Sequence, residues 1–164
     1  MTTRVRPATP ADSAVIYRFI RDLAEYEKLL HEVDATEAGV ARALFCEHPR
    51  IFCDIAETNG EAVGFALWFY SFSTFRGRHG VYLEDLFVRP DARGTGAGRA
   101  LLRRLAQRCL DENLARLEWS VLDWNQPAIV FYDGLGATSK SEWIMRQLTG
   151  EALEKLAAAE PAEA

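Results

Sequence analysis

A glycine-rich segment between an apolar strand and an amphipathic helix constrains the fold of this chain most strongly. The run VYLEDLFV at 81–88 reads as a buried strand, and residues 100–110 carry apolar side chains at helical spacing. Between them, the segment 93–99 places glycine at every second position. Glycine lets backbone N–H groups converge without a side chain in the way, and the start of a helix favours an anion. The segment therefore predicts a phosphate-binding loop in a protein that mixes helices and strands.

The spacing within this loop excludes two common nucleotide-binding motifs. No Gly-Lys-Ser/Thr follows, as a Walker loop requires, and the third glycine comes one residue too early for the Rossmann fingerprint. Arg93 and Arg99 flank the loop, which suits a pyrophosphate with a further phosphate nearby. A flexible connection is the alternative for the glycines taken alone. The candidate coenzyme-binding residues of the loop are Arg93, Gly94, Thr95, Gly96, Ala97, Gly98 and Arg99.

The remaining pattern predicts one α/β domain with a mixed, mostly antiparallel sheet flanked by helices. It should span residues 1–157 and leave a polar tail at 158–164. Asn59-Gly60 predicts a hairpin between two of the strands. We expect helices from about Thr9 to Leu30, from Thr36 to Phe45, and over 100–110, 126–135 and 149 onward, with a short alternating segment at 3–6 and strands at 51–56, 63–72, 81–88, 117–122 and 142–148.

Composition narrows the class of protein. A net charge of -5 disfavours generic nucleic-acid binding. The longest nearly apolar run, 63–72, is too short for a membrane span of about 20 residues, and the N-terminus has no secretory signal. The cysteines are odd in number and unpatterned, which is typical of reduced thiols in the cytoplasm. The histidines lack metal-ligand spacing, so we expect no metal.

Charge is distributed unevenly along the chain. The stretch 22–37 holds six acids and one lysine, whereas 89–108 holds six arginines and one aspartate. The first stretch could attract a cation and the second an anion. The alternative is that both are solvated helix faces.

These motifs resemble the GNAT superfamily of acetyl-CoA-dependent N-acetyltransferases. Arg93-x-x-Gly96-x-Gly98 is similar to the Q/R-x-x-G-x-G/A signature of that superfamily, in which the loop holds the pyrophosphate of the coenzyme. Over nearly its whole length the chain resembles the spermidine/spermine (diamine) N-acetyltransferases more closely. The resemblance implies a GNAT fold, acetyl-CoA as co-substrate, a small amine as acceptor and a homodimer. It is carried by 5–9, 23–27, 63–66, 82–88 and 124–128, and by Phe131-Tyr132 followed by Gly136-Ala137.

The resemblance also implies the catalytic residues. A carboxylate within an apolar strand is costly to bury and calls for an explanation. By the resemblance, Glu84 would take the proton of the amine through water, and Asp85 would help to orient the cationic substrate. Tyr132 would protonate the departing thiolate. The alternatives are that Glu84 or Asp85 points to solvent, because adjacent strand residues face opposite sides, and that Tyr132 only packs in the core.

Three further residues are expected on the coenzyme side. Asn125 would donate or accept a hydrogen bond there, although plain N-capping of the next helix is the alternative. The backbone of Leu86 and Val88 would bind the pantetheine arm as a strand binds its neighbour.

The acidic first helix predicts the substrate. If it reaches the site, Glu27 would pair with an amine, which favours a diamine or polyamine. The family usually has Trp where this chain has Phe75, and Arg76, Arg78 and His79 make the same loop basic. A lysine-like amino acid such as thialysine is therefore an alternative. A protein or peptide acetyltransferase and a non-catalytic acyl-CoA-binding module are two others.

Overall fold

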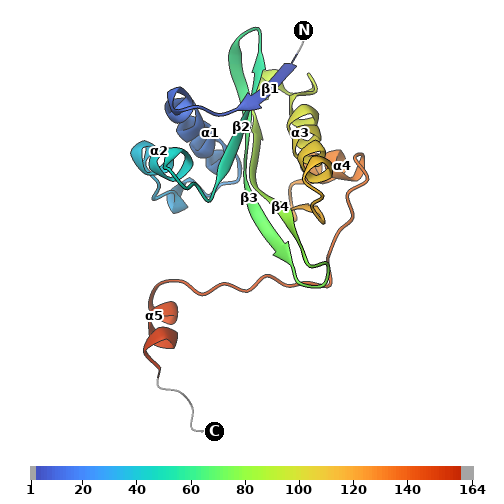
Figure 1. Cartoon of the computed structure of the whole chain (residues 1–164). Helices are drawn as coiled ribbons and strands as arrows, with labels where there is room; N and C mark the ends of the chain where they lie inside the picture. The colour runs from blue at the N-terminus through green and yellow to red at the C-terminus, as the bar shows by residue number, and fades with distance from the viewer. Residues whose placement is uncertain (1–2, 160–164) are drawn as a thin grey trace. The chain divides into compact units, whose positions relative to one another are not determined.

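A five-stranded sheet in the order β1-β2-β3-β4-β5 organises the first of two units in this computed structural model (Figure 1). The structure describes residues 3–159, of which 3–122 belong to the first unit and 123–159 to the second. The first four strands pair antiparallel, and β5 pairs parallel with β4. The α/β class and the mixed sheet are thus confirmed. The strands are β1 (Thr3–Pro7), β2 (Phe52–Thr58), β3 (Glu61–Ser73), β4 (Arg78–Val88) and β5 (Leu117–Trp119).

Helices cover both faces of this sheet. Helices α1 (Ser13–Tyr26) and α2 (Glu37–Phe45) lie on one face, and α3 (Ala97–Asp111) lies on the other (Figure 1). Phe19 of α1 packs its ring against Phe65 of β3 and Phe87 of β4, with centroid distances of 5.8 and 5.6 Å. These contacts place the main core between α1 and the strands that carry the predicted site.

The chain enters α1 through a capping box formed by Thr9 and Asp12. Asp12 accepts hydrogen bonds from the N–H of Thr9 at 2.7 Å and from its hydroxyl at 3.0 Å. Arg6 of β1 also donates to both carboxylate oxygens of Asp12, at 2.7 and 2.8 Å. The hydrogen bonds from Arg6 lower the pKa of Asp12 to about 2. One carboxylate therefore fixes the start of α1 to the edge of the sheet.

Helix α1 ends earlier than the sequence predicted. Its last residue is Tyr26, and Lys28 has a φ of 63°, in the left-handed region. A non-glycine residue with this φ cannot continue a right-handed helix. Leu30, the predicted end, instead begins a short 3-10 turn. The acidic residues that follow Tyr26 therefore do not continue along the axis of α1.

Helices α4 (Gln126–Asp133) and α5 (Gly150–Ala158) form the second unit, close to their predicted positions. The predicted strand at 142–148 is wrong, because those residues form no strand. Trp143, Ile144 and Met145 are 77%, 75% and 74% exposed. The alternating pattern suggested a strand, but a strand needs a neighbour for its backbone groups, and none of the strands within 3–159 pairs with this segment. No helix in that range is long and apolar enough to cross a bilayer.

Candidate active site

A β-bulge at Glu84 shapes the middle of β4. In the pairing of β3 with β4, Leu83 lies opposite Trp68. Asp85 lies opposite Leu67, so Glu84 has no partner residue on β3. A bulge bends its strand and re-aims the side chains around it, and bulges are common beside active sites. Glu84 is exposed, whereas Asp85 is half-buried, so Glu84 is the acid that reaches solvent.

Two other carboxylates, those of Glu84 and Glu27, act on Asp85 at this bulge. Glu27 caps the end of α1 and reaches the neighbourhood of Asp85. Burial, followed by the charges of Glu84 and Glu27, raises the pKa of Asp85 to about 7. Burial also raises the pKa of Glu27. Because gathering carboxylates in a partly buried place costs free energy until a cation offsets their charge, the cluster fits a cationic ligand.

The outer edge of β4 opens beyond the bulge. Strand β5 pairs with Val81–Leu83 alone, and no other strand within 3–159 pairs with the same edge from Glu84 to Val88. Strand β5 itself ends at Trp119, three residues before the predicted end at 122. An unpaired strand edge offers N–H and C=O groups to an extended ligand. Leu86 and Val88 lie along this edge, and the carbonyl of Val88 accepts a hydrogen bond from Arg93 Nε at 3.1 Å.

The glycine loop connects this edge to α3. Gly94 and Gly96 have φ values of 74° and 91°, which favour glycine. A Cβ built at either position meets no atom within 4 Å, so backbone conformation requires glycine there and the space beside the loop is open. Gly96 is the N-cap of α3, and its carbonyl accepts the N–H of Ala100 at 2.9 Å. The N–H groups that precede this bond, those of Ala97, Gly98 and Arg99, have no partner within the helix and suit an anion such as a phosphate.

The polar side chains of the loop differ in how they are held. The guanidinium carbon of Arg93 lies 4.9 Å from the ring centroid of Tyr26, the last residue of α1. The hydroxyl of Thr95 donates to the carbonyl of Ala92 at 2.7 Å and so stabilises the loop itself. Arg99 is exposed. Sequence reasoning did not single out Tyr26, although it directly precedes Glu27.

Asn125 and Tyr132 belong to the second unit. Asn125 is buried, and its Oδ1 accepts the N–H of Ala128 at 3.4 Å, as an N-cap of α4 does. Tyr132 is half-buried near the end of α4, with its ring centroid 5.4 Å from that of Phe131. The capping role of Asn125 is therefore observed. Its coenzyme contact, and proton donation by Tyr132, remain predictions.

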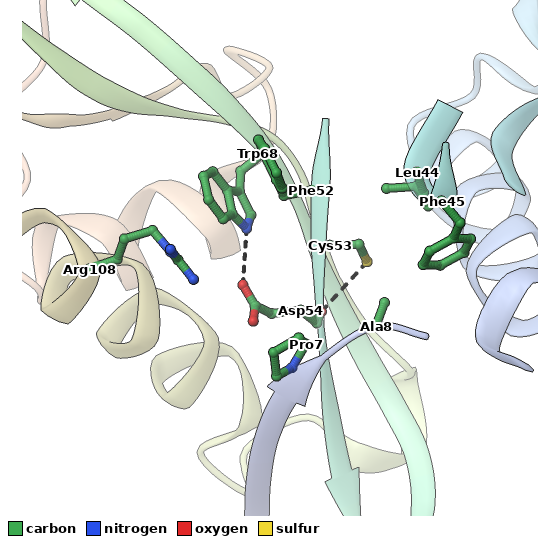
Figure 2. Close-up of a pocket in the computed structure, with 9 residues that line it drawn as sticks. All are labelled: Pro7, Ala8, Leu44, Phe45, Phe52, Cys53, Asp54, Trp68 and Arg108. Atoms are coloured by element: carbon green, nitrogen blue, oxygen red, sulfur yellow. Dashed lines mark hydrogen bonds between the residues drawn. The ribbon is translucent and has the colours of Figure 1, made fainter. Parts of the chain in front are cut away.

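A small cavity lies where β1 ends beside β2, and none of the predicted site residues lines it (Figure 2). Its volume is ≈ 140 Å³. One of the residues that line it, Asp54, is only 2% exposed and accepts a hydrogen bond from Trp68 Nε1 at 2.9 Å. Burial raises the pKa of Asp54, and the Arg104 guanidinium lies 3.9 Å away. Arg108 stacks on Trp68 with its guanidinium carbon 4.7 Å from the ring centroid, so these contacts fix α3, and with it the glycine loop, to the sheet.

Metal binding has no candidate site in the part of the chain that the structure describes. Residues 3–159 contain no group of three or more His, Cys, Asp or Glu side chains that could hold an ion. The expectation of a metal-free enzyme stays a prediction.

Asp85→Asn should stabilise the protein, and more so as the pH rises. Aspartate has an ordinary pKa of 3.8, and the folded value is about 7, so the folded state holds the proton more tightly than the unfolded state. The raised pKa of Asp85 therefore contributes to the free energy of unfolding an amount that is fully present below pH 3.8 and is lost as the pH rises through 7. Asparagine removes the loss. The gain in free energy of unfolding should be larger at pH 8 than at pH 5 by roughly 1 to 3 kcal/mol.

Urea unfolding of both proteins at the two pH values measures this difference. Glu154→Gln, an exposed acid of α5, is the control and should show no pH-dependent gain. Equal stabilisation by Asp85→Asn at both pH values would contradict the raised pKa.

Comparison with known sequences identifies relatives over nearly the whole chain. Thialysine N-epsilon-acetyltransferase of Mus musculus is 38% identical over 167 residues, which cover 95% of this chain and 98% of the relative. L-ornithine N5-acetyltransferase of Arabidopsis thaliana is 30% identical over 201 residues, covering 95% and 88%. Spermidine/spermine N(1)-acetyltransferase-like protein 1 of Homo sapiens is 30% identical over 164 residues, covering 94% of this chain and 24% of that protein.

Comparison with solved structures agrees with the fold. An integron cassette protein of V. cholerae superposes with a TM-score of 0.79 and 28% identity, covering 97% of this chain and 99% of that one. Residues 16–137 match the Acetyltransferase (GNAT) family. With the glycine loop, the bulged acidic strand and these relatives in agreement, the chain belongs to the GNAT family and is an acetyl-CoA-dependent N-acetyltransferase.

Proposed function

We propose that this enzyme acetylates the primary amine of a small cationic substrate of the diamine or polyamine type, by direct transfer in a ternary complex with acetyl-CoA. The observation that carries this proposal is the gathering of Glu27, Glu84 and Asp85 beside the open edge of β4. A diamine brings two separated ammonium groups, and each needs a negative partner once it loses water. Carboxylates from two different elements, α1 and β4, can supply two such positions.

The loop and strand edge that follow the acids fit the coenzyme. Its pyrophosphate would lie against the free N–H groups at the start of α3, between Arg93 and Arg99. The backbone of Leu86 and Val88 would hold the pantetheine arm, and Asn125 would add a hydrogen bond. When bound, acetyl-CoA supplies an acetyl group activated as a thioester.

Two proton transfers then fall to side chains of this enzyme. An amine with a pKa near 10 must lose a proton before its nitrogen can attack. Glu84, exposed at the bulge, accepts this proton through water, while Asp85 orients the ammonium group. As the new C–N bond forms and the C–S bond breaks, Tyr132 donates a proton to the departing sulfur.

A lysine-like amino acid such as thialysine is the second candidate substrate. Its α-carboxylate needs a cation, and the β3–β4 hairpin carries an exposed Arg76 at its tip. The neighbouring Arg78 donates to Asn113 at 2.7 Å, so its charge is already oriented. The names of the thialysine and ornithine relatives favour the same class of substrate.

We also propose that the enzyme is a homodimer in the cytoplasm, with no nucleic-acid or membrane partner. The second unit exposes a set of large apolar side chains, a feature that marks interaction surfaces on soluble proteins. Besides Trp143, Ile144 and Met145, these include Leu153 and Leu156, which are 51% and 62% exposed. A second copy is the partner that the family resemblance implies.

A thiol-release assay with acetyl-CoA tests the reaction and its acceptor. We expect diamines and polyamines to be turned over at lower concentrations than lysine analogues or peptides; the reverse order would favour the second candidate or a peptide enzyme.

Tyr132→Phe should bind coenzyme A as the wild type does and lower turnover by roughly 10²-fold, the usual scale for a lost general acid. Coenzyme binding without thiol release from any amine would instead indicate a non-catalytic acyl-CoA-binding module.

Two glutamate variants separate proton transfer from cation binding. Glu84→Gln should lower turnover by roughly 10²-fold near pH 7 and by less at high pH, where the amine loses its proton unaided. Glu27→Gln should raise KM for a diamine, leave kcat nearly unchanged, and matter little for a monoamine of similar length. Indistinguishable pH profiles on both amines would refute this division of roles.

The oligomeric state can be read from the molar mass in solution. Light scattering should give about twice the 18.4 kDa of one chain for the wild type and a lower mass for Trp143→Ser/Ile144→Asp. Leu110→Ser, at an equally exposed apolar residue of α3, is the matched control and should keep the wild-type mass. A monomeric wild type, or an unchanged mass in the double variant, contradicts this surface.

A further inference from the structure

The contact between Arg93 and Tyr26 joins the two halves of the site. Tyr26 is the last residue of α1 and directly precedes Glu27, whereas Arg93 begins the glycine loop. The guanidinium carbon lies 4.9 Å from the ring centroid, within the range of a cation–π interaction. Its Nε donates to the carbonyl of Val88 at 3.1 Å. Arg93 is thus held by the end of the amine-side helix and by the coenzyme-side strand.

This double attachment leaves the outer end of Arg93 able to bind an anion. Within residues 3–159 no carboxylate forms an ion pair with Arg93, and the side chain is exposed. An unrestrained arginine loses rotamer freedom when it binds a phosphate, and prior fixation lowers that cost. The Tyr26 ring therefore holds Arg93 in position for a phosphate group. Because the ring is uncharged, it does not neutralise the guanidinium.

We propose that Tyr26 is a positioning residue that couples the coenzyme site to the amine site. An amine paired with Glu27 orders the end of α1 and with it the adjoining Tyr26 ring. A coenzyme phosphate on Arg93 orders the same contact from the other side. Ordering this contact costs conformational entropy. Because the ligand that binds first already bears part of this cost, the second ligand binds more tightly, and each raises the affinity for the other. This coupling rests on the proposed function, in which acetyl-CoA and an amine bind together.

Calorimetric titration with coenzyme A, without amine, tests whether Tyr26 contributes to coenzyme binding. Tyr26→Leu should weaken coenzyme A binding about threefold, equivalent to about 0.7 kcal/mol, because it removes the ring under Arg93. Tyr26→Phe keeps a ring and should bind as the wild type does. The matched control is Tyr17→Leu, which removes the other stacked tyrosine of α1, whose ring centroid lies 5.9 Å from the guanidinium carbon of Arg21. It should leave coenzyme affinity unchanged.

A double-mutant cycle then assigns the effect to Arg93. Arg93→Gln alone should weaken coenzyme A binding, and adding Tyr26→Leu to it should cause no further loss. Thermal unfolding of every variant is the test of whether it is folded. If the leucine substitution unfolds the chain, Tyr26→Met replaces it. Equal, additive losses in the two backgrounds would overturn the proposal.

The coupling itself is measured with both ligands. In the wild type, coenzyme A should bind several-fold more tightly with the best amine of the thiol-release panel at saturation, and Tyr26→Leu should reduce that factor towards one. KM for both substrates should rise while kcat stays within about twofold. A wild type that transfers acetyl groups but shows the same coupling factor in Tyr26→Leu overturns this inference and leaves the proposed function standing. A wild type that binds no coenzyme A overturns both.

Discussion

The one-sided pairing of β4 is the constraint on which the site depends. From Val81 to Leu83 the strand pairs with both β3 and β5, and beyond the bulge it pairs with β3 alone among the described strands. The change happens at Glu84, where one extra residue breaks the alternation of side chains. The same few residues therefore bring two acids together, expose a backbone edge, and direct the chain into the glycine loop at the start of α3. The proposed amine site and the proposed coenzyme site both adjoin this single irregularity.

Much of the fold could be predicted because its signals are local. The capping motif at Thr9, the Asn59-Gly60 hairpin and the apolar spacing of α3 each depend on residues close in sequence. Two errors arose where the outcome depends on distant neighbours. The length of β5 depends on where its pairing with β4 stops, and segment 142–148 has no pairing strand in the described chain. The early end of α1 has a local cause, the left-handed φ of Lys28, which the residue type does not signal. A bulge is equally invisible to a pattern of period two, since the run 81–88 reads as an ordinary strand.

The candidate site divides in the same way. Glu84, Asp85 and the glycine loop could be predicted from chemistry, because acids in an apolar strand and glycines before a helix are unusual enough to need an explanation. Tyr132 and Asn125 came only from the resemblance to a family. Tyr26 was missed because an aromatic residue near the end of a helix reads as packing, and its significance depends on an arginine 67 positions away in the chain. Contacts that are long in sequence and made by ordinary residue types are those that a single sequence conceals.

The raised pKa of Asp85 gives the site a second equilibrium besides that of its ligands. At a pH below 7 a cation that pairs with Asp85 must displace a proton, because burial and two neighbouring acids keep the carboxyl protonated. An ammonium group that binds as proposed would therefore release one proton from Asp85. The heat of that binding would include the ionisation heat of the buffer that takes up the proton, and the affinity for the cation would fall as the pH falls below 7.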